Sequence, residues 1–113
     1  MNADITEDGG VLVMNARGRL DAANAAVFDD GAKEILAAEP KNVLLDLDGL
    51  DFISSAGLRS VLTLAKGVRK NGQKLAFCSL PPVVNDVFKI AGFMEIMQVF
   101  ATRDEAMAFL LSS

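Results

Sequence analysis

Two adjacent serines, Ser54 and Ser55, stand where an apolar run ends and a helical pattern begins, in the stretch DFISSAGLR at residues 51–59. A serine directly before a helix is a good N-cap, worth about 1 kcal/mol relative to alanine. A phosphate on either hydroxyl would lie at a helix N-terminus, where backbone N–H groups and the helix dipole favour an anion. The pattern therefore leaves two interpretations open, a helix cap and a phosphorylation site.

Catalysis by these serines has no support in the sequence. The 113-residue chain contains no histidine, which excludes a Ser-His-Asp or Cys-His site and a phosphohistidine carrier. One cysteine without histidine also excludes a typical structural zinc site. We therefore expect a protein that is not an enzyme, with no catalytic residue, no metal ligand and no cofactor.

An acidic strand end, VLLDLDG at residues 43–49, offers a second candidate site. It resembles the first motif of haloacid dehalogenase-type phosphohydrolases, in which the first Asp is the nucleophile and the pair helps to hold magnesium. Carboxylates suit such a hard cation. However, that fold needs further acidic ligands and a lysine in set contexts, and the later acidic residues here are isolated. We favour a turn at Asp48-Gly49, with Asp46 facing a sheet edge or a hydrogen-bonding partner.

Charge and hydropathy narrow the range of partners. The net charge is −4 and the basic residues are scattered, which argues against nucleic-acid binding. The N-terminal MNADITEDGG lacks the features of a signal peptide, and no apolar run approaches the roughly 20 residues that span a bilayer, so we expect no direct membrane insertion. Cys78, within LAFCSL, is expected to be a buried thiol, which fits a reducing cytoplasm.

Apolar periodicity and turn residues predict elements in the order ββαβαβαβα. Asp21 is the expected N-cap of the first helix, and Gly49–Ser55 is expected to be a loop. Thr102 and Glu105 match a capping box. The expected strands cover residues 3–7, 11–16, 43–47, 74–80 and 96–100, the last at an edge, and the expected helices cover 22–38, 56–70, a segment opened by Pro81 and Pro82, and 102–111.

Strands that alternate with helices predict a single α/β domain, with a mostly parallel or mixed sheet and helices packed against it. Partners of such sheets often bind loops beyond the C-terminal ends of strands. The loop that carries the two serines lies at an end of that kind.

The same loop, with the strand NVLLDLDGL before it, resembles the STAS domain family. This family includes anti-sigma factor antagonists and the cytoplasmic domains of sulfate transporters. The resemblance covers the whole chain, residues 1–113, and includes GRLD at 18–21 and LPPVVNDVFKIAGF at 80–93. Family antagonists commonly read Asp-Ser-Ser/Thr-Gly-Leu in the loop, and the first serine after that Asp is phosphorylated.

Residue by residue, the resemblance places Ser55 on the phosphorylated serine and Ser54 on the usual Asp. Ala56 takes the place of the following Ser or Thr, and Gly57 and Leu58 match the family. Asp21 matches the family's Asp beside the loop. The resemblance thus implies phosphorylation at Ser55 and partner contacts at Asp21, Ser54, Ala56, Gly57 and Leu58. The replacement of Asp by Ser54 also creates a second possible acceptor.

The function that the resemblance implies is a partner switch in bacterial transcription. The unmodified protein would bind an anti-sigma factor that is a serine kinase of the GHKL type, which would free a sigma factor. Phosphate on Ser55 would block that binding, and a PP2C-type phosphatase would restore it. Two alternatives stay open: a STAS subunit of another signalling or lipid-transport assembly, and a structural domain whose serines only cap a helix.

Overall fold

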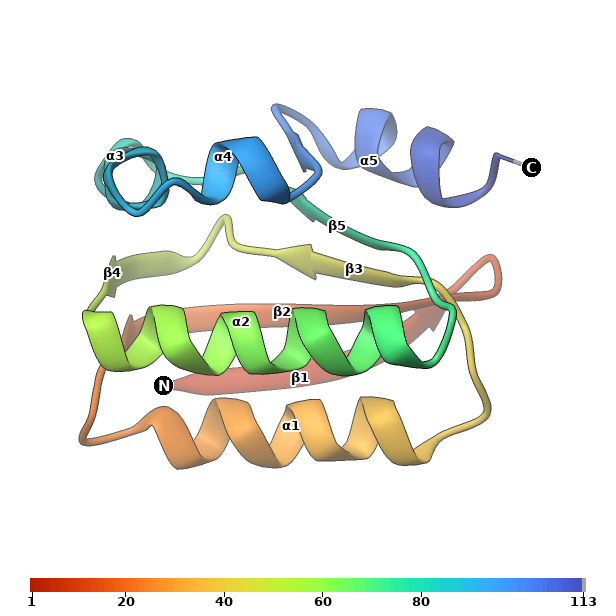
Figure 1. The fold of residues 1–113 in the computed structure, drawn as a ribbon, viewed down its shortest axis with the longest axis horizontal. Coiled ribbons are helices and arrows are strands. Elements are labelled where there is room, and N and C mark those ends of the chain that lie inside the picture. The colour runs from red at the N-terminus through yellow and green to blue at the C-terminus, as the bar shows by residue number, and fades with distance from the viewer. Residues whose placement is uncertain (113) are drawn as a thin grey trace.

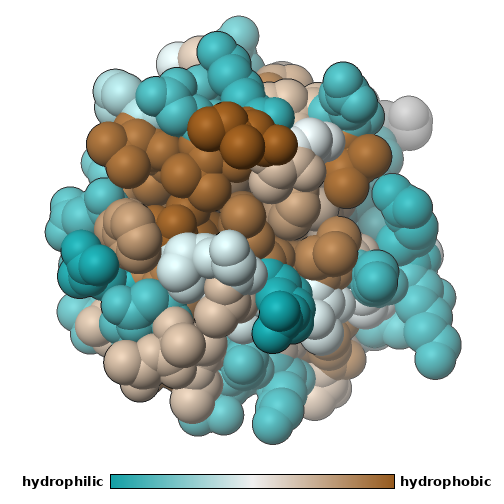
Figure 2. Space-filling model, turned by 60° about the vertical axis from the view of Figure 1, so that its left-hand side comes forward, coloured by the Kyte–Doolittle hydropathy of each residue, from teal (hydrophilic) through white to brown (hydrophobic). Residues whose placement is uncertain are grey.

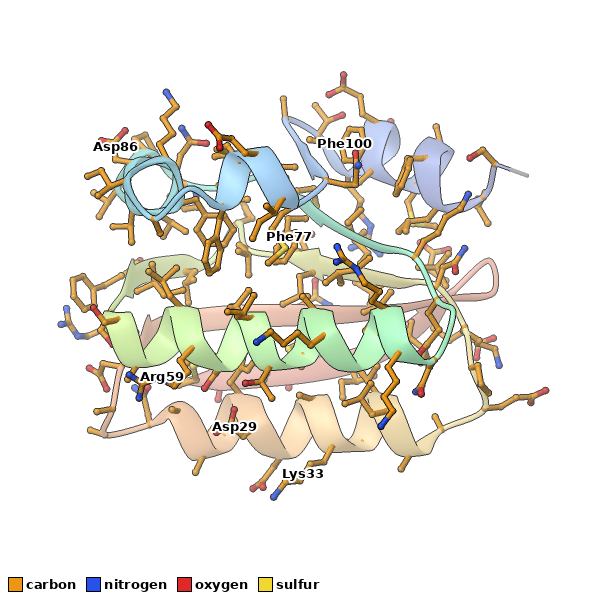
Figure 3. All side chains as sticks on the ribbon, viewed as in Figure 1. Asp29, Lys33, Arg59, Phe77, Asp86 and Phe100 are labelled. Atoms are coloured by element: carbon orange, nitrogen blue, oxygen red, sulfur yellow. The ribbon has the colours of Figure 1, made fainter. Side chains whose placement is uncertain are left out.

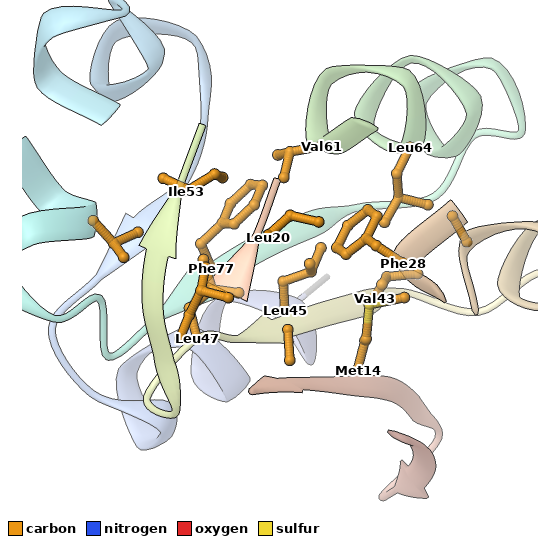
Figure 4. Packing of buried hydrophobic residues seen from close by; sticks show 14 of the residues in the cluster. Met14, Leu20, Phe28, Val43, Leu45, Leu47, Ile53, Val61, Leu64 and Phe77 are labelled. Atoms are coloured by element: carbon orange, nitrogen blue, oxygen red, sulfur yellow. The ribbon is translucent and has the colours of Figure 1, made fainter. Parts of the chain in front are cut away.

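The central strands alternate between two apolar faces, and this alternation builds two hydrophobic clusters. The computed structural model describes residues 1–112. Met14, Leu45 and Phe77 belong to the larger cluster, which also receives side chains from α1 (Ala25–Ala37) and α2 (Ser55–Lys70). Their neighbours Val13, Leu44 and Ala76 belong to a smaller cluster closed by α5 (Arg103–Leu110). Strands buried on both faces are typical of parallel sheets that helices cover on both sides; Figure 4 shows the larger cluster.

The sheet is mixed, as predicted. Its strand order is β1-β2-β3-β5-β6, and Figure 1 shows how the helices surround it. β1 and β2 form the antiparallel hairpin, whereas β2, β3, β5 and β6 pair in parallel. The strands are β1 (Asn2–Asp8), β2 (Val11–Leu20), β3 (Val43–Asp46), β5 (Leu75–Cys78) and β6 (Val99–Phe100).

One additional strand, β4 (Leu50–Ile53), lies within the segment that the sequence predicted to be a loop. It pairs in parallel with the second half of β2, which continues to Leu20 instead of ending near residue 16. Gly18 makes this continuation possible, since its φ of 93° accommodates the register shift between Gly18 and Arg19. Gly18 therefore marks a bulge within a strand that is longer than predicted.

The start of the first helix also differs from the prediction. Asp21 is not its N-cap, because α1 begins at Ala25 with Asn24 in the cap position. The Asp21 carboxylate instead accepts a hydrogen bond from the Ala23 N–H at 3.0 Å, and the Asn24 side chain accepts one from the Asp21 N–H at 2.9 Å. The two side chains hold a turn ahead of the helix, and this turn delays its first residue.

Two further helices pack against each other, and the first of them lies against β4. α3 (Pro82–Ile90) begins with a proline at its first turn, as predicted, and Gly92, with a φ of 78°, leads into the short α4 (Phe93–Ile96). α4 occupies part of the predicted last strand, so β6 begins only at Val99. The Phe88 and Phe93 rings pack edge to face with centroids 5.3 Å apart, which fixes α4 against α3. The capping box of Thr102 and Glu105 is confirmed.

Cys78 is fully buried, as predicted, and burial raises the pKa of its thiol to about 11 because the thiolate would lose its hydration. An unfolded thiol loses its proton near pH 8.5. Between that pH and about 11 the unfolded chain releases a proton that the folded chain retains, so Cys78 makes the protein less stable as pH rises through this range.

Urea unfolding between pH 8 and 10.5 should show a steeper loss of stability for wild type than for Cys78→Ala. Equal slopes would contradict this assignment.

Candidate functional site

The site is built where two paired strands end together. Leu20, the last residue of β2, is the register partner of Ile53, the last residue of β4. Asp21 follows the first and Ser54 follows the second, so the parallel pairing brings both residues to the same edge of the sheet. The Ser54 N–H extends this pairing, since it donates to the Leu20 carbonyl oxygen at 3.0 Å.

Ser54 is the N-cap of α2, which confirms the helix-cap interpretation for this serine. Its backbone is extended, with φ −96° and ψ 177°, and its hydroxyl accepts a hydrogen bond from the Gly57 N–H at 3.3 Å. Its carbonyl oxygen accepts the first helical bond, from the Leu58 N–H at 2.9 Å. The side chain is half-buried and committed to the helix.

Ser55 lies in a different environment from its neighbour. It is the first residue of α2, it is exposed, and no hydrogen bond joins its hydroxyl to any other residue between 1 and 112. The two hydroxyls that the sequence could not separate therefore differ in burial and in bonding. A modifying enzyme can approach Ser55 without opening the helix.

Gly57 allows the helix to approach β2 closely. A Cβ at this position would lie 2.6 Å from the Leu20 carbonyl oxygen and 2.8 Å from an Ile53 side-chain carbon, both closer than real contacts permit. Two of its three nearest neighbours belong to Leu20, the residue that also binds Ser54. Glycine at this position is a packing requirement.

Charged and aromatic side chains border the serines. The Arg19 guanidinium lies 4.3 Å from the centroid of the Phe52 ring, and its Nε is 3.7 Å from a carboxylate oxygen of Asp21. Asp51 is exposed on β4. Asp48 lies before β4, at the end of the strand remote from Ser54, and the four residues of β4 span about 13 Å. Asp21 therefore lies at the same edge of the sheet as Ser54 and Ser55, whereas Asp48 does not.

An exposed apolar area adjoins the start of α2, and we call it the α2–α3 patch. It comprises the exposed Val83 and Ile90 of α3 with the half-buried Leu58 and Leu62 of α2 and Val87 of α3. Ile90 is 87% exposed and Val83 54% exposed. Figure 2 shows apolar side chains gathered over this end of the molecule. Exposed apolar areas of this kind commonly mark protein–protein contacts. The patch was not predicted, although the helical period already pointed Val83 and Ile90 outward.

Asp46, half of the acidic pair, has a structural role. One of its oxygens accepts the Asp48 N–H at 3.1 Å, and the other is 3.4 Å from the Arg103 guanidinium, which also contacts Asp8 at 3.2 Å. Over residues 1–112, no three His, Cys, Asp or Glu side chains are arranged to hold a metal ion. The Arg103 guanidinium thus joins the ends of β1 and β3 to the start of α5, and Asp46 has the hydrogen-bonding partner expected for it.

A protein-family model matches nearly the whole chain and identifies its family. The model of the STAS domain family matches residues 2–106. The chain belongs to the STAS domain family.

Named relatives agree with this assignment. A putative anti-sigma factor antagonist of Bordetella bronchiseptica, BtrV, is 39% identical over 88% of this chain and 85% of its own length. The anti-sigma-F factor antagonist RsfA of Mycobacterium tuberculosis is 24% identical over 96% of this chain and 86% of its own. The crystal structure of an anti-sigma factor antagonist from Mycobacterium paratuberculosis has a TM-score of 0.90 at 18% identity, over 98% and 94% of the two chains. No helix within residues 1–112 has the length and hydropathy to cross a membrane.

The two glycines of α2 provide a test of the close approach. Gly57→Ala should lower the free energy of unfolding by about 1–3 kcal/mol, because the new methyl group meets backbone and β-strand atoms. Gly67→Ala is the matched control. There a Cβ meets only the end of the Leu36 side chain, and alanine favours the helix by roughly 0.5–1 kcal/mol. Urea denaturation of both variants should separate them, and equal stabilities would contradict the packing argument.

The cap predicts a difference between the two serines. Ser54→Ala should cost about 1 kcal/mol, because the Gly57 N–H loses its acceptor. Ser55→Ala should change stability by less than about 0.5 kcal/mol, since its side chain is exposed. Thermal unfolding of the two single variants measures this difference directly, and a larger effect at Ser55 would reverse the assignment.

Proposed function

We propose that this protein is an anti-sigma factor antagonist that acts through a phosphorylation-controlled partner switch, with Ser55 as the phosphate acceptor. The observation that carries the proposal is the exposed, uncommitted Ser55 at the start of α2, next to the α2–α3 patch. The 39% identity with the putative antagonist BtrV over most of both chains supports the same role.

In this proposal the unmodified protein presents its docking surface at the start of α2. Asp21, Ser54, Ala56, Gly57 and Leu58 contact the anti-sigma factor. The α2–α3 patch extends this surface with apolar area that a partner can bury. Binding of the anti-sigma factor releases its sigma factor.

Phosphate on Ser55 then opposes docking by charge and bulk, without refolding the domain. It adds about −1.5 to −2 charges at the edge of the sheet that carries Asp21. A like-charge contact in an interface costs several kcal/mol, and 1.4 kcal/mol is a tenfold loss of affinity. A single modification on the rim of the patch is therefore sufficient to switch partner binding off.

The enzymes of this cycle are the ones that the resemblance to STAS antagonists implies. The anti-sigma factor is also the serine kinase, of the GHKL type, and a PP2C-type phosphatase removes the phosphate. The antagonist itself binds and is not an enzyme. We place it in the cytoplasm, where the buried Cys78 stays reduced, and we assign all of residues 1–113 to the STAS domain.

Two substitutions at Ser55 test the switch. Ser55→Asp should reduce binding to the cognate anti-sigma factor by at least about 100-fold while the circular dichroism spectrum stays native. Ser55→Ala should bind like the wild type and remain bound after treatment with the kinase. Ser54→Ala is the matched control, and it should still lose binding when phosphorylated.

Calorimetric titration measures the affinities, and mass spectrometry of the kinase-treated protein locates the phosphate. Phosphate on Ser54, or loss of binding by kinase-treated Ser55→Ala, would contradict the assignment of Ser55. Absence of any anti-sigma factor among co-purifying proteins, with another assembly captured instead, would contradict the function.

A further inference from the structure

Arg59 is an uncommitted cation on the same face of α2 as Ser55. The two residues are four positions apart, which places their Cβ atoms about 5–6 Å from each other on a helix surface. Both are exposed. Five ion pairs occur within residues 1–112, and none of them includes Arg59. A guanidinium without an anionic partner is therefore within reach of the proposed phosphate.

The direction of the side chain favours the pairing. Long side chains on a helix lean toward its N-terminus, so a residue covers the turn that precedes it. Arg59 accordingly leans toward the turn that begins with Ser55. Figure 3 shows Arg59 near the start of α2, on the side that faces α1.

We infer that Arg59 binds the phosphate of phosphorylated Ser55 within the same molecule, as a positioning residue for the modified state. This inference rests on the proposed function, because it requires phosphate at Ser55. A phosphate dianion accepts two parallel hydrogen bonds from a guanidinium, which lysine cannot supply in the same geometry. Phosphorylation of Ser55 thus turns Arg59 from a free cation into a phosphate-bound one. The surface that a partner protein contacts is then changed at both Ser55 and Arg59.

Other charged groups near Arg59 and Ser55 could compete for these contacts. Asp29 and Lys33 of α1 line the same surface cavity as Arg59, which has a volume of about 340 Å³. Asp21, which is paired with Arg19, lies at the same edge of the sheet as Ser55, and Asp51 is exposed further back on β4. Arg19 is already held by Phe52 and Asp21, whereas Arg59 has no carboxylate within 4.0 Å among the pairs found in residues 1–112. The phosphate dianion is the stronger of the available anions for the free guanidinium.

The test installs phosphoserine at position 55 during synthesis of the full chain, so that no kinase is needed. The second pKa of the phosphate is then measured by ³¹P NMR titration in wild type, Arg59→Gln, Arg59→Lys and Arg69→Gln. Arg69 is the matched control, because it is an exposed arginine in the last turn of the same helix. Its removal changes the net charge equally, about 20 Å from Ser55 along the helix.

A bound guanidinium stabilises the dianion, so Arg59→Gln should raise the phosphate pKa by about 0.2–0.4. The phosphate pKa in Arg59→Lys should lie between the values in wild type and in Arg59→Gln. The phosphate pKa in Arg69→Gln should equal that in wild type. The Arg59 Nε–H signal should also shift on phosphorylation. Equal pKa values in the Arg59→Gln and Arg69→Gln proteins, with an unchanged Nε–H signal, would overturn the inference. Failure of a kinase to modify Ser55 would instead count against the proposed function, which this measurement does not involve.

Discussion

The Leu20 carbonyl oxygen is the point on which the site depends. It accepts the Ser54 N–H at 3.0 Å, and it would lie 2.6 Å from any Cβ at Gly57. The same atom therefore holds the end of β4 and sets how closely α2 approaches β2. Ser55 lies between the two residues that make this contact, Ser54 and Gly57, and its own side chain is exposed.

The two neighbouring serines thus have different positions: Ser54 caps the helix, and Ser55 is the proposed phosphate acceptor. Ser54 is half-buried and bonded to Gly57, whereas Ser55 is exposed. A phosphate on Ser55 can change the charge of the surface while the cap, and hence the fold, stays intact. The division explains how a switch can act on binding through local electrostatics alone.

Local sequence patterns predicted much of this structure. The capping box of Thr102, the buried Cys78 and the helix that begins after the serines all follow from short-range rules. β4 was missed because it depends on pairing with a distant strand across the Gly18 bulge. The predicted cap at Asp21 was wrong because the Asp21 and Asn24 side chains together hold a turn ahead of the helix. The α2–α3 patch depends on which outward faces become neighbours, and periodicity contains no such information.

The central claim is that the charge at Ser55, and not at Ser54, controls partner binding. The most direct measurement compares the affinity for the cognate anti-sigma factor of two proteins, one with phosphoserine installed at 55 and one with it at 54. Because only Ser54 caps the helix, the second protein should also lose thermal stability. We predict a loss of affinity of at least about 100-fold for phosphate at Ser55 in a protein as stable as the wild type. Unchanged affinity in that protein would contradict the account.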